Sequence, residues 1–222
     1  ALHNQYASGA FNTSNLELTQ AIIEAAAEQN SAVIVQTSEG AIDYAGLDVL
    51  AGIIKGVSEE YKVPVIMNLD HGKSYERAQE CIDAGYTMVM IDASKEEFEE
   101  NISITRKVVE MAHARGVWVE AELGAILGAE GAKGLGGEKT PDSFFTNPNQ
   151  VLEFIERTEV DALAVSVGTI HGAFTGQEFI RFELLDIIEK LVPDVPLVVH
   201  GASGIAMDHL KRVATKNVCK IN

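Results

Sequence analysis

Short apolar runs of strand length alternate along this chain with longer segments whose apolar residues recur at helical spacing. The pattern predicts eight strands, at residues 7–12, 32–37, 65–70, 88–92, 117–122, 161–168, 196–200 and 218–222. Between them it predicts helices at 16–28, 47–61, 74–84, 98–114, 148–157, 182–191 and 207–215. Regular alternation favours a parallel sheet, and eight strands favour an α/β fold of the (β/α)8 TIM barrel type over an open doubly wound sheet.

The predicted barrel is incomplete at its end. Only seven helices accompany the eight strands, and the chain stops at Asn222, on the last strand. A closed barrel carries a helix outside its final strand. We therefore expect residues 1–222 to form a single (β/α)8 barrel domain that lacks its last helix, with a C-terminal part missing from this sequence.

Composition narrows the kind of protein. With 46% hydrophobic residues among 222, the chain can bury a large core, but no run approaches the ~18 apolar residues of a membrane span. The net charge of −16 repels phosphate backbones, so we expect no nucleic-acid partner. The start lacks a signal-peptide pattern, and Cys81 and Cys219 have no close Cys or His neighbour. These features predict buried free thiols in a cytoplasmic enzyme without membrane contact.

Three apolar runs end in a His-Gly pair, at His71, His171 and His200, and these are half of the six histidines in the chain. Parallel barrel strands direct their C-terminal ends to one face, where such enzymes place their chemistry. Any one of these residues alone could be a loop histidine or a hydrogen-bonded core histidine. As a set of three imidazoles they would leave a fourth position on zinc open, which is typical of a catalytic metal.

Acidic residues also stand at the C-terminal ends of predicted strands. Asp70 directly precedes His71 where the chain turns into a loop, so one can bind metal while the other acts as general base. The alternative for Asp70 is a turn or helix-capping role. Asp92 and Glu122 also end strand-like runs and could orient the histidines or hold a metal in another position. Glu120, on the same side of its strand as Glu122, is interpreted as a structural acid of the barrel interior.

Glycines mark two further features. Residues 125–147 form a long segment with five glycines, which favours a lid. Gly172 follows one candidate ligand, and the turn containing Gly201 and Ser203 follows another. Their backbone N–H groups and the hydroxyl could cradle a phosphate, which barrels often bind after their late strands.

Eight short motifs occur in order along the chain: Gly-Ala-Phe-Asn at 9–12, Ser-Glu-Gly at 38–40, Asp-His-Gly at 70–72, Met-Ile-Asp-Ala-Ser at 90–94, Glu-Ala-Glu-Leu-Gly at 120–124, Gly-Thr-Ile-His-Gly at 168–172, His-Gly-Ala-Ser-Gly at 200–204 and Lys-Ile-Asn at 220–222. This ordered set resembles the class II, metal-dependent fructose- and tagatose-bisphosphate aldolases over nearly the whole chain. The resemblance implies that His71, His171 and His200 bind a catalytic Zn²⁺. It also implies that Asp92 and Glu122 can hold a second or displaced metal ion. A second divalent ion or a monovalent cation is thus a possible further cofactor.

The resemblance further implies two proton-transfer residues. Asp70 matches the residue that moves a proton on the C4 hydroxyl, and Glu130 matches a mobile-loop acid that exchanges a proton with the dihydroxyacetone carbon. The positions implied in substrate and phosphate binding are Asn12, Ser38, Gly172, Gly201, Ser203 and Asn222. Thr175 is a departure, because many relatives carry Lys there for a phosphate contact.

Together these expectations describe a zinc aldolase that reversibly cleaves a ketose 1,6-bisphosphate to dihydroxyacetone phosphate and glyceraldehyde 3-phosphate. Fructose is the first choice of sugar and tagatose the second, and the expected assembly is a homodimer or homotetramer. The alternatives are a zinc-dependent hydrolase on the same barrel and a non-catalytic phosphosugar-binding protein. A Schiff-base aldolase would need a lysine inside the barrel, and Lys220 is the only candidate on the predicted strands.

Overall fold

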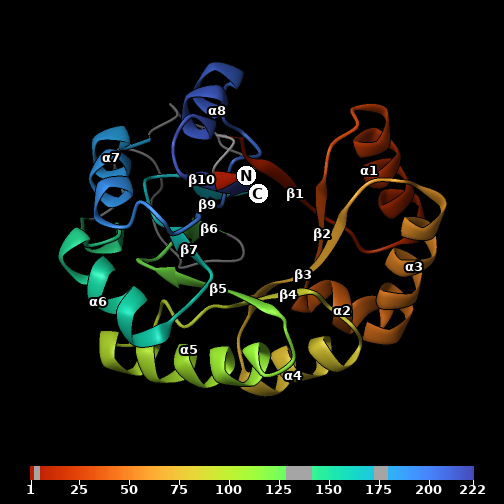
Figure 1. Cartoon of the computed structure of the whole chain (residues 1–222), viewed down its shortest axis with the longest axis horizontal. Coiled ribbons are helices and arrows are strands. Elements are labelled where there is room, and N and C mark those ends of the chain that lie inside the picture. Colours follow the sequence, from red (N-terminus) through yellow and green to blue (C-terminus); the bar gives the residue numbers. More distant parts are fainter. Residues whose placement is uncertain (3–5, 129–141, 173–179) are drawn as a thin grey trace. The chain divides into compact units, whose positions relative to one another are not determined.

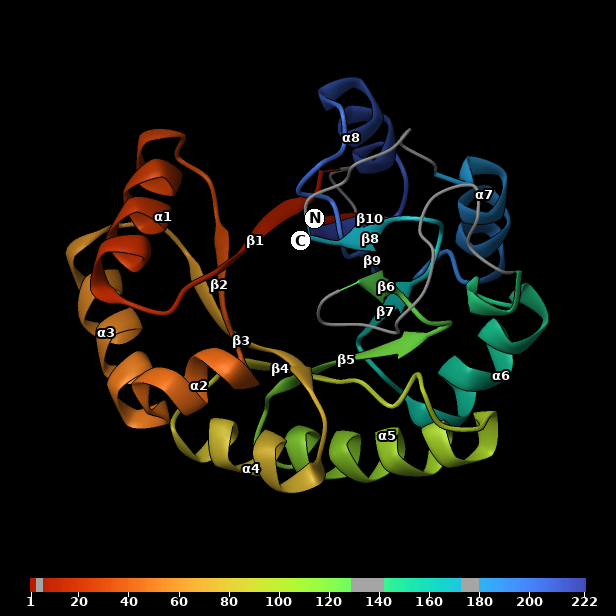
Figure 2. The same cartoon turned by 180° about the vertical axis from the view of Figure 1, so that it is seen from behind.

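The fold is a closed barrel of eight strands with helices between them, as the sequence predicts (Figures 1 and 2). The computed structural model describes residues 1–2, 6–128, 142–172 and 180–222. Around the barrel the strands follow the order β1 (Ser8–Asn12), β10 (Val218–Ile221), β9 (Leu197–Val199), β7 (Ala162–Val165), β5 (Trp118–Leu123), β4 (Met88–Ile91), β3 (Val65–Gly72) and β2 (Val33–Ser38). All eight predicted barrel strands are therefore present.

The seven predicted helices are confirmed to within a residue or two, and the structure adds a short one. The α-helices are α1 (Leu16–Glu28), α2 (Glu39–Ala45), α3 (Leu47–Glu60), α4 (Tyr75–Asp83), α5 (Phe98–His113), α6 (Pro148–Thr158), α7 (Phe182–Leu191) and α8 (Met207–Ala214), with a 3-10 turn at Asp142–Phe144. Helix α2 was not expected, because its seven residues are too few to show a helical period. It begins directly after β2, where the Ser38 hydroxyl accepts the N–H of Ala41.

Local signals in the sequence decide where the longer helices begin. Asn15 caps α1 by accepting the N–H of Leu18 at 2.9 Å. Ser74 caps α4 in the same way, with the N–H of Arg77 at 3.1 Å. Each cap satisfies a donor that has no partner within the helix, so both predicted starts are confirmed.

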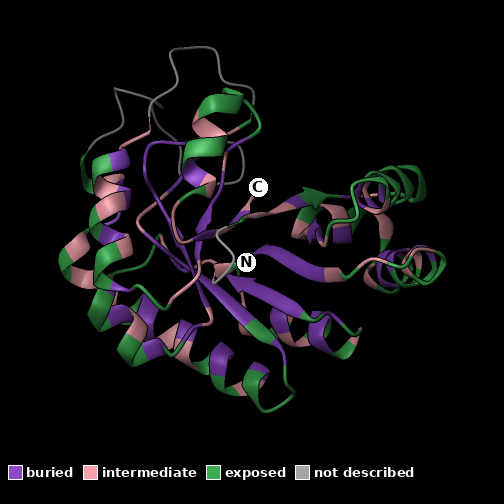
Figure 3. Ribbon diagram, turned by 45° about the horizontal axis from the view of Figure 1, so that its top comes forward, coloured by how far each residue is buried: buried purple, intermediate pink, exposed green. Residues whose placement is uncertain are grey.

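The chain groups into two compact units, each with its own buried residues. The N-terminal unit holds residues 8–92 and 107–120, and the C-terminal unit holds 1–7, 93–106 and 121–222. In each unit the strands are largely buried, while the helices present an exposed side (Figure 3). That 1–222 form one barrel domain remains a prediction.

Fully buried apolar side chains define the core of each unit. In the N-terminal unit they include Val35, Leu50 and Leu69, and in the C-terminal unit Phe154 and Leu185. Within the described residues no helix is both long enough and apolar enough to cross a membrane.

The cysteines agree with expectation in one respect and differ in another. Both are free, and Cys81 is buried in α4. Cys219 on β10 is only partly buried, because neighbouring residues of this four-residue strand alternate between more and less buried positions. The prediction of two buried thiols was therefore wrong for Cys219.

The segment leading to His171 differs from the prediction. The strand expected at 161–168 ends at Val165, and His171 lies on a separate two-residue strand, β8 (Ile170–His171). Strand β8 pairs in parallel with β6 (Leu127–Gly128) in a small second sheet. The carbonyl of Val167 accepts the N–H of Arg181, and Gly168 takes a φ of +106°, so the backbone leaves the strand conformation before it reaches His171.

Candidate active site

The end of β3 carries the first two candidate residues, Asp70 and His71. Both are buried, with exposed fractions of 2% and 5%. His71 has a φ of +46°, a conformation that is uncommon for residues other than glycine. The register of β3 against β4 shifts between Leu69 and Gly72, so His71 lies in an irregularity that breaks strict alternation of side chains along the strand. Residues held in such conformations are frequent at functional sites.

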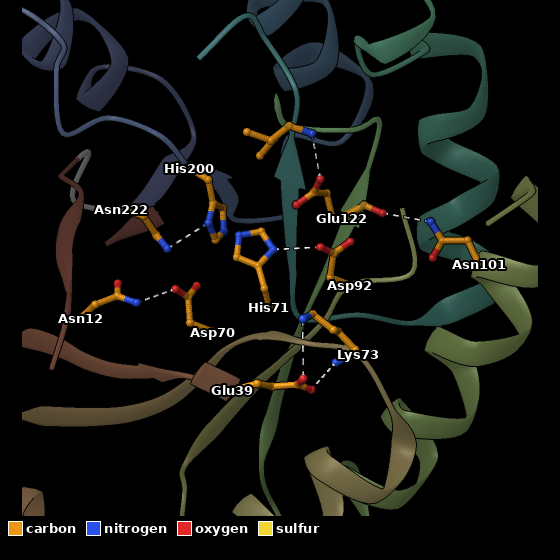
Figure 4. A network of polar contacts seen from close by, with 11 residues as sticks. Asn12, Glu39, Asp70, His71, Lys73, Asp92, Asn101, Glu122, His200 and Asn222 are labelled. Atoms are coloured by element: carbon orange, nitrogen blue, oxygen red, sulfur yellow. Dashed lines mark hydrogen bonds and ion pairs between the residues drawn. The ribbon is translucent and has the colours of Figure 1, made fainter. Parts of the chain in front are cut away.

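The glycine after His71 is needed for close packing. A Cβ on Gly72 would lie 2.7 Å from the carbonyl oxygen of Met90 and would also clash with Leu69. The next residue is held by Glu39, whose carboxylate accepts the backbone N–H of Lys73 at 2.8 Å (Figure 4). The backbone is therefore fixed on the C-terminal side of His71.

Asp92 contacts His71 directly. Its Oδ2 lies 2.9 Å from Nδ1 of the imidazole (Figure 4), and both side chains are at least nine-tenths buried. The backbone N–H of Asp92 donates to the carbonyl of Gly72 at 2.8 Å, which places the carboxylate beside the ring. A carboxylate on one imidazole nitrogen fixes the ring and leaves the other nitrogen to bind a metal. Of the two roles expected for Asp92, this contact favours that of orienting a histidine.

Asp70 is held by an amide from β1, which is separated from β3 by β2 in the strand order. Asn12 donates its Nδ2 hydrogen to Oδ2 of Asp70 at 2.8 Å (Figure 4). The Oδ1 atom of Asn12 accepts a hydrogen bond from Gln36, which is fully buried on β2. Sequence reasoning missed Gln36, although a large polar residue directly after the apolar run of a strand was the available signal. Ser38 stands opposite Asp70 in the strand register and also caps α2.

In the C-terminal unit, Glu122 is 99% buried near the end of β5. Its Oε1 accepts the backbone N–H of Ile126 at 3.2 Å. Its backbone carbonyl accepts a hydrogen bond from Asn101 (Figure 4). The Oδ1 atom of Asn101 in turn accepts from the Thr105 hydroxyl. The chain turns immediately after the strand, so these contacts hold the carboxylate at the turn. Glu120, also buried, agrees with its interpretation as an interior acid.

His171 and His200 lie side by side in the C-terminal unit. Their ring centroids are 5.8 Å apart and the ring planes meet at 86°. His200 follows β9 directly and is 1% exposed, and its Nδ1 lies 3.0 Å from Nδ2 of Asn222. The backbone of Asn222 is tied to the same strand, because its N–H donates to the carbonyl of Val199. Asn222 therefore holds the plane of the His200 ring.

The two glycines of the predicted phosphate cradle have backbone angles that residues other than glycine rarely adopt. Gly172 has a φ of +100° and Gly201 a φ of +69°. A Cβ on Gly201 would clash with the backbone of Ile170, so the loop after β9 packs tightly against β8. Ser203 is exposed in the turn that follows. Glycine is thus required here for backbone conformation and close approach, whatever ligand the loop binds.

Three predictions fall wholly or partly outside the described residues. Glu130 and Thr175 lie in the ranges 129–141 and 173–179, which the structure does not describe. The proposed lid at 125–147 is described only at its two ends. Lys220, the Schiff-base candidate, lies on β10 and is 3% exposed.

Comparison with known proteins decides the family. The sequence matches the family model "Fructose-bisphosphate aldolase class-II" over residues 1–222. The chain belongs to this family. It is 44% identical over its whole length to the fructose-bisphosphate aldolase of Geobacillus stearothermophilus and spans 76% of that protein. It is 48% identical to the enzyme of Thermus caldophilus, over 93% of this chain and 67% of that protein.

Solved structures agree with this class II aldolase assignment. The YdjI aldolase from Escherichia coli K12 superposes with a TM-score of 0.85 at 34% identity, over 100% of this chain and 76% of that one. A putative fructose-1,6-bisphosphate aldolase from Coccidioides immitis gives a TM-score of 0.87 at 29% identity, over 99% and 77% of the two chains. The resemblance, the (β/α)8 fold and the lyase class predicted from the sequence are confirmed, while the hydrolase and non-catalytic alternatives find no support.

Proposed function

We propose that this class II aldolase cleaves fructose 1,6-bisphosphate reversibly to dihydroxyacetone phosphate and glyceraldehyde 3-phosphate, as in glycolysis. The observation that carries the proposal is the buried Asp70–His71 pair at the end of β3, with Asn12 bonded to the acid and Asp92 to the imidazole. The family match over residues 1–222 supports the reaction type, and the names of the relatives support fructose over tagatose as the sugar.

The metal that the family requires fits the donors of this chain. We propose that His71, His171 and His200 bind a zinc ion, and that His71, Asp92 and Glu122 form a second group able to hold a displaced or additional cation. Three imidazoles are the usual donors for catalytic zinc and leave a position for substrate. When bound, zinc supplies Lewis-acid polarisation of the substrate carbonyl.

The residues of the chain supply proton transfer. In the cleavage direction Asp70 takes the proton of the C4 hydroxyl, and in condensation it returns that proton. Asn12 donates to Oδ2 of Asp70, which fixes how the carboxylate is turned. Asp92 keeps the imidazole of His71 in one orientation. Glu130, outside the described residues, is proposed to exchange the proton at the dihydroxyacetone carbon.

Substrate binding is proposed for a second set of residues. Gly172, Gly201 and Ser203 would bind the C1 phosphate through backbone N–H groups and a hydroxyl. The positive φ of both glycines supports this, because such turns can direct successive N–H groups at an anion. The polar side chains proposed to contact the sugar are Asn12, Ser38 and Asn222.

We further propose a cytoplasmic location and a homodimer or homotetramer. The two free thiols, Cys81 and Cys219, are consistent with a reducing compartment. Exposed apolar side chains of the N-terminal unit, among them Phe11, Leu18 and Val49, offer surface for a second copy. Sedimentation analysis would measure the assembly directly.

A direct assay tests the proposed reaction. Cleavage of fructose 1,6-bisphosphate and of tagatose 1,6-bisphosphate is measured with and without a chelator. We expect chelator-sensitive cleavage with fructose as the better substrate. Binding of the phosphosugar without any turnover, in protein verified to contain zinc, would contradict the proposal and favour the non-catalytic alternative.

A further inference from the structure

A row of three amide side chains crosses the N-terminal unit beneath Asp70. Asn12 on β1 stands opposite Gln36 on β2, and Gln36 stands opposite Asn68 on β3. Gln36 and Asn68 are both 0% exposed. Asp70 lies two residues after Asn68 on the same strand, one step closer to the strand end. Buried amides are costly unless they are hydrogen-bonded, so the contacts within this row determine its conformation.

The hydrogen bonds of the row all run in one direction. Asn68 donates from Nδ2 to Oε1 of Gln36 at 3.3 Å. Gln36 donates from Nε2 to Oδ1 of Asn12 at 2.8 Å. Asn12 donates from Nδ2 to Oδ2 of Asp70 at 2.8 Å (Figure 4). Each amide therefore donates with its nitrogen toward the carboxylate, and Gln36 and Asn12 also accept with their oxygens.

The carboxylate of Asp70, at the end of the row, fixes the direction of these hydrogen bonds. An ionised carboxylate accepts hydrogen bonds and cannot donate them, so Asn12 must turn its NH₂ group to Asp70. Asn12 then offers its oxygen to Gln36, which in turn must offer its own oxygen to Asn68. Only a donor at position 68 satisfies that arrangement.

We propose that Asn68 is a positioning residue for the aldol reaction, acting through Gln36 and Asn12 to hold the carboxylate of Asp70 in its working orientation. This inference rests on the proposed function, because it assumes that Asp70 moves the C4 hydroxyl proton. Among the described residues, Oδ1 of Asn68 has no hydrogen-bond partner, so the requirement of Gln36 for a donor is what orients the Asn68 amide. Asn68 thus ends the row and supplies the donor that Gln36 requires.

Reversing the direction of the row is the sharpest test. In Asn68→Asp the new carboxylate accepts only, so Gln36 must turn its NH₂ group toward position 68. Asn12 must then donate to Gln36 and direct its oxygen at Asp70, which turns the carboxylate away. Asn68→Leu, of similar volume, removes the donor without reversing the row and should have the smaller effect. It also provides a second variant if the charged one folds poorly.

Assays of two reactions distinguish a misplaced Asp70 carboxylate from a general disturbance of the active site. Cleavage of fructose 1,6-bisphosphate requires Asp70, whereas hydrogen exchange between dihydroxyacetone phosphate and solvent involves no C4 hydroxyl. We expect Asn68→Asp to lower kcat for cleavage by about 10²-fold, the scale of a misplaced catalytic group, while exchange changes less than about twofold. Zinc content should stay at the wild-type level.

Thr37→Val is the matched control. Thr37 neighbours Gln36 on β2, is fully buried, and bonds to the hydroxyl of Tyr86 at 2.7 Å. Losing that bond disturbs the same strand on its opposite face, so the variant should lose stability yet keep cleavage. A parallel loss of cleavage and exchange in Asn68→Asp, or unchanged cleavage, would overturn the inference.

A crystal structure of Asn68→Asp gives a readout that does not depend on aldolase activity. We expect Asn12 and Asp70 to separate beyond hydrogen-bond distance. If they stay at 2.8 Å, the row does not control Asp70 and the inference is wrong. Failure of the wild-type protein to cleave fructose 1,6-bisphosphate would instead refute the proposed function, while this distance would still decide whether Asn68 controls the carboxylate.

Discussion

The Oδ2 atom of Asp92 lies 2.9 Å from Nδ1 of His71, and both side chains are buried. The pair joins the end of β3 to the residue that follows β4, so the fold itself fixes the imidazole. A histidine held through Nδ1 presents Nε2, which is the geometry of a metal ligand with a carboxylate behind it. The contact connects the packing of two neighbouring strands to the proposed metal chemistry.

Asp92→Asn should weaken zinc binding without abolishing it. The amide can keep a contact with the ring but loses the negative charge that fixes the tautomer, so we expect zinc affinity to fall about 10- to 100-fold. Competition with a calibrated chelator measures the affinity. Asp43→Asn is the control, because it makes the same change at an exposed carboxylate, which pairs with Arg77 on the surface. Equal affinities in wild type and Asp92→Asn would show that the pair is structural.

Removing one proposed ligand should remove the metal. His200→Ala leaves two imidazoles, which hold zinc poorly, so we expect loss of both zinc and cleavage. Elemental analysis after dialysis measures the zinc. His113→Ala, at an exposed position on α5, should keep a full complement of metal. Cleavage by wild-type protein freed of metal would contradict the zinc mechanism.

Asp70→Ala should separate the proposed base from the proposed ligands. We expect near-stoichiometric zinc together with a loss of cleavage of about 10²- to 10⁴-fold, the range for a general base. The measurements are kcat for fructose 1,6-bisphosphate and metal content of the same preparation. Loss of the metal in this variant would make Asp70 a ligand and would reverse the division of roles between it and His71.

Borohydride should have no specific effect on this enzyme. A Schiff-base aldolase traps dihydroxyacetone phosphate on a lysine, and the buried candidate here is Lys220 on β10. We expect no inactivation and no added mass on the peptide containing Lys220, as read by mass spectrometry. A reduced adduct at that residue would place the enzyme in the other mechanistic class.

Cys81 should react with alkylating agents only after unfolding. Burial raises the pKa of its thiol to about 12, so on the order of 10⁻⁴ of it is thiolate at pH 8. Cys219 is partly exposed, and burial raises its pKa as well. In native protein at pH 8 we expect labelling of Cys219 first and of Cys81 at least about 10²-fold more slowly than in denaturant. Rapid native labelling of Cys81 would show that α4 opens readily.

Much of the site could be read from residue order. The His-Gly pairs and the acids at strand ends are local signals, and the sequence located each of them. The row of amides formed by Asn12, Gln36 and Asn68 could not be predicted from the sequence. Gln36 and Asn68 look like ordinary strand residues until the pairing of β1, β2 and β3 sets them opposite Asn12.

The sequence by itself determined the eight-strand alternation and the resemblance to class II aldolases, because these depend on patterns within short stretches of chain. Only the tertiary structure decided that His71 takes a positive φ at an irregularity of β3, and that His171 stands on a short strand outside the barrel ladder. Both depend on hydrogen bonds between segments distant in sequence, such as that from Arg181 to Val167. The periodicity of side chains along the sequence carries no information on such hydrogen bonds. The irregular backbone conformations that position His71 and His171 are therefore seen only in the folded chain.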